Sequence, residues 1–336
     1  MANQAQFHPR RWLLHLAEGI ERAGGVIVEG CRVTEVEGQG RTVVVGDQRV
    51  EANGVVIATH FPIPDRGGFF ARLEPERDLV VSGPVDAAQA PHAAYLCTSE
   101  SRSVRTVPDG NGGRRILVGG ENYRTGTTSD VQSRYAALAD FASTHFGVTD
   151  ITHRWSAHDL VTPDGVPLVG PLLPGAQHLW VAAGFSLWGM TGGTAGGRLV
   201  ADLILGRADE HWAALCDPGR LGLDQVPGVA KDNAVVARHL LGDIAAAALR
   251  DGSSSSLVPG ESRVGRVGGR LVASYCDEVG QVHSVSAHCT HLGCVVAFND
   301  AERSRDCPCH GSRFALDGSV LHGPATEPLQ ASTQDL

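Results

Sequence analysis

Apolar residues recur at helical spacing near the start of the chain. Within the segment Pro9 to Gly25 they lie three or four positions apart, at Leu13, Leu16, Ala17 and Ile20. This spacing places them on one face of a helix, and a Gly-Gly pair then ends the pattern. The runs VIVEGCRVTEVEG, RTVVVGDQRVEA and GVVIATHFPIP follow, rich in β-branched residues and separated by turn residues. They predict three strands.

The middle of the chain keeps alternating between the two periodicities. From Asp78 to about Tyr123 the pattern is typical of strands, and VQSRYAALADFASTHFG then restores a helical period. Farther on, HLWVAAG (His178 to Gly184), a Gly-rich turn and TAGGRLVADLILGR predict a strand followed by a helix.

A change of pattern near residue 250 predicts a domain boundary. The segment Lys231 to Arg250 has a helical pattern and could be a helix or a tether, and DGSSSS (Asp251 to Ser256) is typical of a flexible joint. From Leu257 onward the chain has short strand patterns, frequent turn residues and no convincing helix. We therefore expect an N-terminal domain at 1–225, a linker at 226–256 and a small all-β domain at 257–336.

Composition agrees with a two-domain chain and excludes some classes of binding partner. At 336 residues the chain is long enough for two hydrophobic cores, and 42% hydrophobic and 19% charged residues are ordinary for a globular protein. The net charge is −9 and the basic residues are scattered, which argues against nucleic acid or an anionic membrane as a partner. No membrane span or secretory signal is evident, so we expect a cytoplasmic location and small molecules or proteins as partners.

Cysteines are sparse except near the C-terminus, where four of the eight fall between Cys289 and Cys309. Cys289 and His291 form a Cys-x-His pair, and Cys307 and His310 form a Cys-x-x-His pair. Clustered Cys and His residues in such a chain more often bind a metal than join loops. Two cysteines and two histidines suit a [2Fe-2S] centre with mixed ligands.

A structural zinc site is the alternative, because four Cys and His ligands also suit tetrahedral Zn²⁺. Zinc leaves Cys294, Cys309 and the Gly-Ser pair after His310 without a role, so we favour the iron-sulfur interpretation. Both boxes, CTHLGC and CPCHGS, resemble those of the Rieske family. The resemblance implies four cluster ligands, a disulfide between Cys294 and Cys309, and a proline loop at Gly323 to Ala325; the implied ligands are Cys289, His291, Cys307 and His310.

Two further residues of this motif bear on the reduction potential. Ser312 is placed to donate a hydrogen bond to the cluster, which would raise the potential. Phe314 stands where high-potential members of the family carry a Tyr, so we expect a value below the top of the ~−150 to +300 mV Rieske range. His288 and His322 lie near the boxes in sequence, and we expect both at the surface.

The larger part of the chain resembles the D-amino-acid-oxidase-like (DAO, glycine oxidase type) FAD-dependent oxidoreductases. The resemblance is carried by HPRRWLLHLAEGIERAGG, GVVIATH, GGENYRTG, RWSAHD and GFSLWGMT in that order, and bacterial members with a C-terminal Rieske module are the most similar. It implies an α/β Rossmann-like FAD-binding domain with an antiparallel substrate sheet, followed by a small Rieske β-sandwich. The implied cofactors are FAD and a Rieske [2Fe-2S] cluster.

The same resemblance implies where FAD and substrate bind. A helix N-terminus after HLWVAAG suits an electron-rich flavin carbonyl or a phosphate, although a plain strand-helix junction is the alternative. Arg105 and Tyr123 are weaker candidates for substrate contacts, and Asp164, in the turn-like TPDG, is weaker still. The cofactor-binding candidates are Val33, Ala58, Thr59, Gly184, Phe185, Trp188, Gly189, Met190 and Thr191.

One departure from the family affects the functional prediction. Such folds open with a strand, a GxGxxG turn for the pyrophosphate and a later acidic residue for the ribose, and this sequence has no such opening. We therefore expect an N-terminally incomplete FAD domain that binds FAD weakly or not at all by itself. The predicted function is oxidation of an amine-type or related small-molecule substrate through FAD, with electrons passing through the Rieske cluster to or from an unidentified acceptor or donor protein. The alternative is a Rieske electron-transfer module attached to a non-functional flavin-domain remnant.

Overall fold

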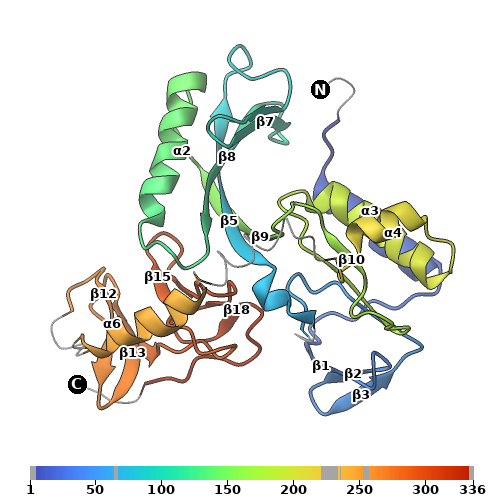
Figure 1. The fold of residues 1–336 in the computed structure, drawn as a ribbon. Coiled ribbons are helices and arrows are strands. Elements are labelled where there is room, and N and C mark those ends of the chain that lie inside the picture. Colours follow the sequence, from blue (N-terminus) through green and yellow to red (C-terminus); the bar gives the residue numbers. More distant parts are fainter. Residues whose placement is uncertain are drawn as a thin grey trace.

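The computed structural model describes residues 5–63, 67–220, 234, 236–250, 252 and 257–332. A mixed α/β region occupies residues 5–220, here called the N-terminal region, and an all-β part occupies residues 257–332, here called the C-terminal module (Figure 1). Within the described residues, no helix is long and apolar enough to cross a membrane.

Helix α1 (Pro9–Arg22) forms where the apolar spacing predicts it. It begins with a proline in its first turn, and the His8 side chain accepts a hydrogen bond from the Arg11 backbone N–H at 3.4 Å. None of its residues is buried, and Leu13 and Ile20 are 54% and 50% exposed. The described residues therefore leave the apolar face of this helix uncovered.

Four short strands follow instead of the three predicted. Strands β1 (Val33–Glu37), β2 (Thr42–Val45) and β3 (Gln48–Glu51) form an antiparallel sheet, and β4 (Val55–Ile57) belongs to another. The prediction of a strand was wrong for residues 26–28, which are exposed and form none. A strand must pair its backbone groups with a neighbour, and no described strand lies beside this stretch.

A three-stranded sheet of order β10-β11-β4 carries the strand-helix unit predicted from HLWVAAG. Strand β11 (Leu179–Ala183) pairs in parallel with β4 and antiparallel with β10 (Leu168–Pro171). Its alternate residues are buried, which turns one face toward the core. Helices α3 (Gly189–Ile204) and α4 (Glu210–Cys216) pack against β10 (Figure 1).

A five-stranded antiparallel sheet forms the second half of the N-terminal region, in the order β6-β7-β8-β5-β9. Helix α2 (Val131–Phe146) packs on it, with Leu138 and Ala142 fully buried in the same core cluster as Leu79 and Ile116. This confirms the strand and helix patterns predicted between residues 78 and 147. The strands are β5 (Glu74–Val85), β6 (Tyr95–Cys97), β7 (Arg102–Pro108), β8 (Arg114–Arg124) and β9 (His153–Val161).

The C-terminal module consists of two antiparallel sheets and no helix within residues 257–332. Before it, a π-helical turn (Arg238–Gly242) runs into α6 (Asp243–Ala248), whose Ala247 joins the core of the module. Most of the predicted joint at 251–256 lies outside the described residues. The first sheet contains β12 (Ser262–Val267), β13 (Arg270–Cys276) and β14 (Val282–Ser286); the second contains β15 (Ala297–Asn299), β16 (Ser304–Asp306), β17 (Arg313–Phe314) and β18 (Val320–His322).

Candidate iron-sulfur site and flavin-facing surface

Two loops of similar construction carry the predicted cluster ligands. One connects β14 to β15 and the other connects β16 to β17. In the first, the Gly293 N–H donates to the Cys289 carbonyl at 2.9 Å; in the second, the Gly311 N–H donates to the Cys307 carbonyl at 3.1 Å. The two turns are therefore closed by equivalent backbone hydrogen bonds.

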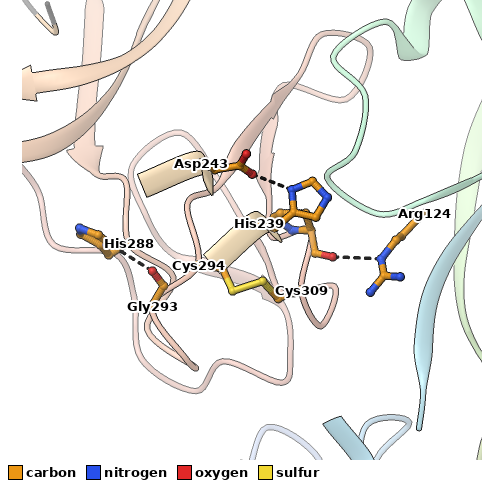
Figure 2. Close-up of a disulfide and its surroundings, with 8 residues drawn as sticks. Arg124, His239, Asp243, His288, Gly293, Cys294 and Cys309 are labelled. Atoms are coloured by element: carbon orange, nitrogen blue, oxygen red, sulfur yellow. Dashed lines mark hydrogen bonds and ion pairs between the residues drawn. A yellow bond between two sulfur atoms is a disulfide. The ribbon is translucent and has the colours of Figure 1, made fainter. Parts of the chain in front are cut away.

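A disulfide joins the two loops. Cys294 and Cys309 are bonded, with their Cα atoms 6.5 Å apart (Figure 2). Both side chains are buried in the core of the C-terminal module. The bond holds the two ligand-bearing turns against each other and leaves Cys289 and Cys307 as thiols.

The four remaining cysteine and histidine side chains converge between the loops. Cys289 and Cys307 are 3% and 1% exposed, and the rings of His291 and His310 lie 4.9 Å apart. The Cys307 side chain hydrogen-bonds to Cys289 and lowers the pKa of the Cys289 thiol, while the same hydrogen bond and burial raise the pKa of Cys307. Burial lowers the pKa of His310 to about 3 and also lowers that of His291, so both imidazoles are neutral, as iron ligands must be.

These residues fit a mixed-ligand [2Fe-2S] cluster. Within the described residues, the Nδ1 atoms of His291 and His310 are buried without a hydrogen-bond partner. Buried imidazole nitrogens without partners are costly unless an ion completes them. Two thiols and two neutral imidazoles are the donor set of a Rieske centre.

Neighbouring residues shape the surroundings of the cluster. Ser312 hydrogen-bonds to Cys289 through its side chain and accepts a bond from the Ala325 N–H at 3.0 Å. Ala325 belongs to the predicted proline loop, so Ser312 links that loop to a ligand sulfur. Phe314 is completely buried in the same core and offers the sulfurs no hydroxyl.

The histidine edge of this site faces the N-terminal region. The Phe61 ring lies 5.8 Å from that of His291 and 6.0 Å from that of His310. Phe70, in the short helix η2 (Phe69–Ala71), lies 6.1 Å from His310. His310 is 1% exposed as a result, so the edge through which a Rieske cluster would contact a partner is already covered.

Close backbone approaches and charges hold the two parts together. A Cβ added at Gly311 would lie 2.6 Å from His158 and Pro75, and one added at Gly126 would lie 2.6 Å from the Pro308 nitrogen. Arg124 donates to the Pro308 carbonyl at 3.2 Å, reaching toward the disulfide-bonded loops (Figure 2). These contacts leave no room for side chains at two glycines.

Glu302 is the centre of a buried polar network across this interface. Its carboxylate accepts from Arg77 at 3.0 Å and from Tyr135 at 3.0 Å in the N-terminal region, and from Arg313 at 2.5 Å in its own module. Burial acts to raise the pKa of Glu302, but the positive charges of Arg77 and Arg313 outweigh it and leave the pKa lowered. The carboxylate is therefore ionised and joins the two parts electrostatically.

The predicted flavin-facing turn lies between β11 and α3. Gly184 is buried with φ of +72°, a conformation that suits glycine, and Trp188 is the N-cap of α3 and 58% exposed. The Thr191 hydroxyl donates back to the Trp188 carbonyl at 3.3 Å. The turn therefore presents an exposed helix N-terminus formed by Gly189, Met190 and Thr191 beside the half-buried Phe185.

The adenosine-side candidates lie apart in chain order but on neighbouring elements. Ala58 and Thr59 are exposed at the end of β4, where the Thr59 hydroxyl donates to the Phe61 carbonyl at 2.7 Å. Val33 begins β1 and is half-buried. All three assignments stay predictions.

The substrate candidates are not brought together. Arg105 is exposed on β7 opposite Leu117, whereas Tyr123 lies farther along β8 and is buried. The Tyr123 hydroxyl accepts from Asn299 of the C-terminal module at 3.3 Å, and burial raises its pKa to about 12. Asp164 is paired with Arg220 at 3.0 Å and forms part of a turn, as the alternative reading of TPDG predicts.

The expectation of a surface position was wrong for His322. Its ring lies 4.5 Å from that of His158 and 5.4 Å from that of His60, because β18 faces the N-terminal region. His288 is half-buried and its Nδ1 lies 3.0 Å from the Gly293 carbonyl (Figure 2). The sequence did not identify five residues that lie at the interface between the two parts, because each contacts a residue more than a hundred positions away. They are Phe61, Phe70, His60, His158 and Glu302.

Comparison with known proteins identifies both parts. The family model for FAD dependent oxidoreductases (DAO) matches residues 1–203, and the model for the Rieske [2Fe-2S] domain matches residues 248–333. The domain limits expected above, 225 and 257, are not tested by these matches.

Two relatives match over very different lengths of the chain. YhfW of Bacillus subtilis (strain 168), whose name describes a Rieske 2Fe-2S iron-sulfur protein, is 34% identical over 337 residues, covering 98% of this chain and 65% of YhfW. The chain thus spans just under two thirds of that relative. The cytochrome b6-f complex iron-sulfur subunit 3 of Nostoc sp. (strain PCC 7120) is 50% identical over 54 residues, 16% of this chain and 28% of that subunit.

Among solved structures, glycine oxidase from Geobacillus kaustophilus superposes with a TM-score of 0.53 at 21% identity, over 62% of this chain and 57% of that one. This likeness establishes the fold of the N-terminal region. FAD and a Rieske [2Fe-2S] cluster are the cofactors of the two matched domains. The chain therefore belongs to the FAD-dependent oxidoreductase (DAO) family and carries a C-terminal Rieske [2Fe-2S] domain.

Proposed function

We propose that this protein oxidises an amine-type or related small substrate with FAD and passes the electrons to the Rieske cluster of the same chain. The observation that carries the proposal is the packing of the iron-binding histidines on Phe61 and Phe70. Phe61 follows the end of β4, where Ala58 and Thr59 are the candidates for the adenosine half of FAD. A cluster edge covered by the oxidoreductase domain is suited to exchange electrons inside the molecule.

Residues of this chain would hold part of the flavin. The exposed helix N-terminus at Gly189 to Thr191 offers backbone N–H groups and a partial positive charge to an electron-rich carbonyl. When bound, FAD supplies two-electron oxidation of a substrate and release of single electrons to an iron-sulfur acceptor. The phenylalanines exclude water from the edge of His310.

Arg105 remains the proposed contact for a substrate carboxylate. It is an exposed guanidinium on the antiparallel sheet that the family places over the flavin. Asp78 lies near enough to interact with it, and burial raises the pKa of Asp78 to about 6 although the charge of Arg105 opposes that shift. A guanidinium that binds both an acid of the protein and a carboxylate of the ligand is a common anchoring arrangement.

The test is anaerobic mixing of iron-loaded protein with FAD and a panel of primary and secondary amino acids. The chain is joined in frame to a GxGxxG-containing βαβ unit of the family so that FAD is held. We expect the EPR signal of the reduced cluster to appear only when both FAD and a substrate are present. A flavin that substrate bleaches while the cluster stays oxidised would contradict internal transfer. If no amine reduces the bound flavin, the Rieske electron-transfer module is the better description.

A further inference from the structure

Three histidines meet at the interface between the two parts of the chain, outside the iron-sulfur site. His60 follows β4 and His158 lies in β9, both in the N-terminal region, whereas His322 ends β18 of the C-terminal module. The ring centroids are 5.0 Å apart for His60 and His158, 5.4 Å for His60 and His322, and 4.5 Å for His158 and His322. One nitrogen from each ring lies within 4.8 Å of the others.

Three ring nitrogens of this cluster lack hydrogen-bond partners in the described part of the chain. Both ring nitrogens of His158 are buried without a hydrogen bond, and so is Nδ1 of His60. The other nitrogen of His60, Nε2, lies 3.0 Å from the His158 carbonyl. A buried nitrogen without a partner is costly, so such nitrogens on two facing rings indicate a bound species between them.

The imidazoles are in the form that binds metal. The pKa of His158 lies well below its usual value, mainly because the ring is buried and also because of the charges of His322 and His60. Burial lowers the pKa of His322 to about 4. Arg77 and Arg313 also face the cluster and act in the same direction, while Asp306 opposes them at His322. Neutral imidazole is the commonest protein ligand for zinc.

The arrangement matches a three-histidine metal site. With Zn–N distances of about 2.0–2.1 Å and tetrahedral angles, ring centroids of three histidine ligands lie about 5 Å apart. The observed centroid separations of 4.5–5.4 Å bracket that value. Asp159 lies 3.8 Å from Nε2 of His60. A carboxylate at this place can orient the ring of a metal-binding histidine without touching the metal.

We propose that His60, His158 and His322 bind one zinc ion that links the oxidoreductase domain to the Rieske domain. The site is separate from the [2Fe-2S] site, whose four ligands are other residues. His158 lies against Gly311, next to the iron ligand His310, so the zinc fixes the position of the cluster relative to Phe61 and Phe70. Zinc is redox-inert, so it serves this purpose without competing for electrons, and a water molecule completes its fourth coordination position.

The test counts metals in the full chain with its cluster in place. Purified protein is treated with EDTA, dialysed against Zn²⁺ and analysed for zinc and iron. We expect about one zinc per chain in addition to the two irons of the cluster. His60→Gln and His322→Gln should each lower zinc affinity at least tenfold with iron content unchanged. The control is His153→Gln, an exposed histidine on the same strand as His158, which should bind zinc as the parent does.

Two results would overturn the proposal. The first is a parent protein that keeps its iron and binds no zinc above the His60→Gln background. The second is zinc bound equally by all variants, which would place the ion elsewhere. Should a variant lose its iron, Co²⁺ titration of the parent protein decides instead: visible d–d bands of a tetrahedral three-nitrogen site are expected, and their absence refutes the site.

Discussion

Around the cluster, single side chains decide how strongly the ligand sulfurs are hydrogen-bonded. Ser312 is bonded to Cys289, and Phe314 fills the buried position at which a phenol could provide a second bond. Hydrogen bonds to ligand sulfurs stabilise the reduced cluster, which carries more negative charge. The potential of this cluster is therefore adjustable at two neighbouring positions.

Phe314→Tyr should raise the midpoint potential of the cluster. A new hydrogen bond of about 1 kcal/mol to the reduced state corresponds to roughly 40 mV for one electron. Protein-film voltammetry measures the shift. Phe298→Tyr is the control, because Phe298 stacks on Tyr275 at 4.6 Å rather than packing in the cluster core, and it should leave the potential unchanged. A lowered or constant potential in Phe314→Tyr would show that the hydroxyl does not reach a sulfur.

Glu302→Gln should destabilise the protein in a pH-dependent way. The pKa of Glu302 is lowered in the folded state, so its charge stabilises the fold above the unfolded value of about 4.3, and that contribution is lost as pH falls through the folded pKa. We expect a loss of about 1–3 kcal/mol near neutral pH that shrinks below roughly pH 4. Urea unfolding at several pH values measures it. Glu278→Gln, whose side chain is 66% exposed, should cost less than about 0.5 kcal/mol at any pH.

At the scale of elements, the Rieske domain completes a helix of the oxidoreductase domain. The backbone N–H groups of Val131 and Gln132 donate to the Asp300 carboxylate at 2.8 and 3.2 Å. The residue at the local N-cap position, Asp130, makes no capping hydrogen bond with its side chain. The start of α2 is thus capped by a loop 169 residues away (Figure 1).

Asp300→Ala should loosen α2 and weaken domain association. Removing an N-cap carboxylate costs about 0.5–2 kcal/mol, and favourable interaction with the helix dipole is lost as well. Hydrogen exchange in the first turn of α2 should become faster in Asp300→Ala. Asp130→Ala provides the matched control and should change the exchange rate little. Equal effects of the two substitutions would mean that Asp130 supplies the cap in solution.

Substitutions at the equivalent glycines of the two ligand loops can distinguish the effect of backbone strain from the effect of contacts across the interface. Gly293 and Gly311 both have φ of +79°, but a Cβ meets nothing within 4 Å at Gly293 and meets His158 and Pro75 at Gly311. Alanine at either position should lower the free energy of unfolding by about 1 kcal/mol, because a residue with a Cβ is strained at positive φ. Only Gly311→Ala should also push the domains apart, which increased cleavage of the linker in limited proteolysis would reveal. Equal cleavage of both variants would contradict the tight packing.

The elements that could be predicted are those whose information is local. The two Cys-His boxes, the apolar period of α2 and the β11-to-α3 turn each lie within about twenty residues, and the structure contains each of them. Residues 26–28 failed as a strand because pairing depends on a neighbour, not on β-branched composition alone. Three other features depend on residues distant in sequence, and the pattern of apolar residues does not predict them. These are the capping by Asp300, the burial of Tyr123 and the clustering of His322 with other histidines.

At the scale of the whole molecule, apolar surface gathers in the first part of the chain. Helix α1 buries none of its residues, Val26 and Val28 are 83% and 67% exposed, and Val56 on the outer strand β4 is 41% exposed. Exposed apolar side chains and an edge strand each favour association with a further element. A family-type βαβ unit, for which this sequence has no GxGxxG turn, is a suitable element to cover this surface.

Expressed by itself, the 336-residue chain should keep its iron-sulfur cluster and bind little FAD. All four proposed cluster ligands and the disulfide lie in one module, so iron should be retained at about two atoms per chain. FAD should be nearly absent, because the pyrophosphate of a dinucleotide binds on a GxGxxG turn and its ribose on an acidic residue, and the sequence contains no such turn.

Adding a family-type βαβ unit in frame should bring flavin content close to one FAD per chain, measured by release of flavin on denaturation against iron in the same sample. The control is the same unit with its GxGxxG glycines replaced by Val, which covers the apolar surface of α1 and β4 without cradling a pyrophosphate. If the control also binds FAD, coverage of that surface is what the cofactor requires. If the chain alone already carries about one FAD, the β11–α3 turn and the end of β4 hold the cofactor without a pyrophosphate loop, and the expectation of weak binding is wrong.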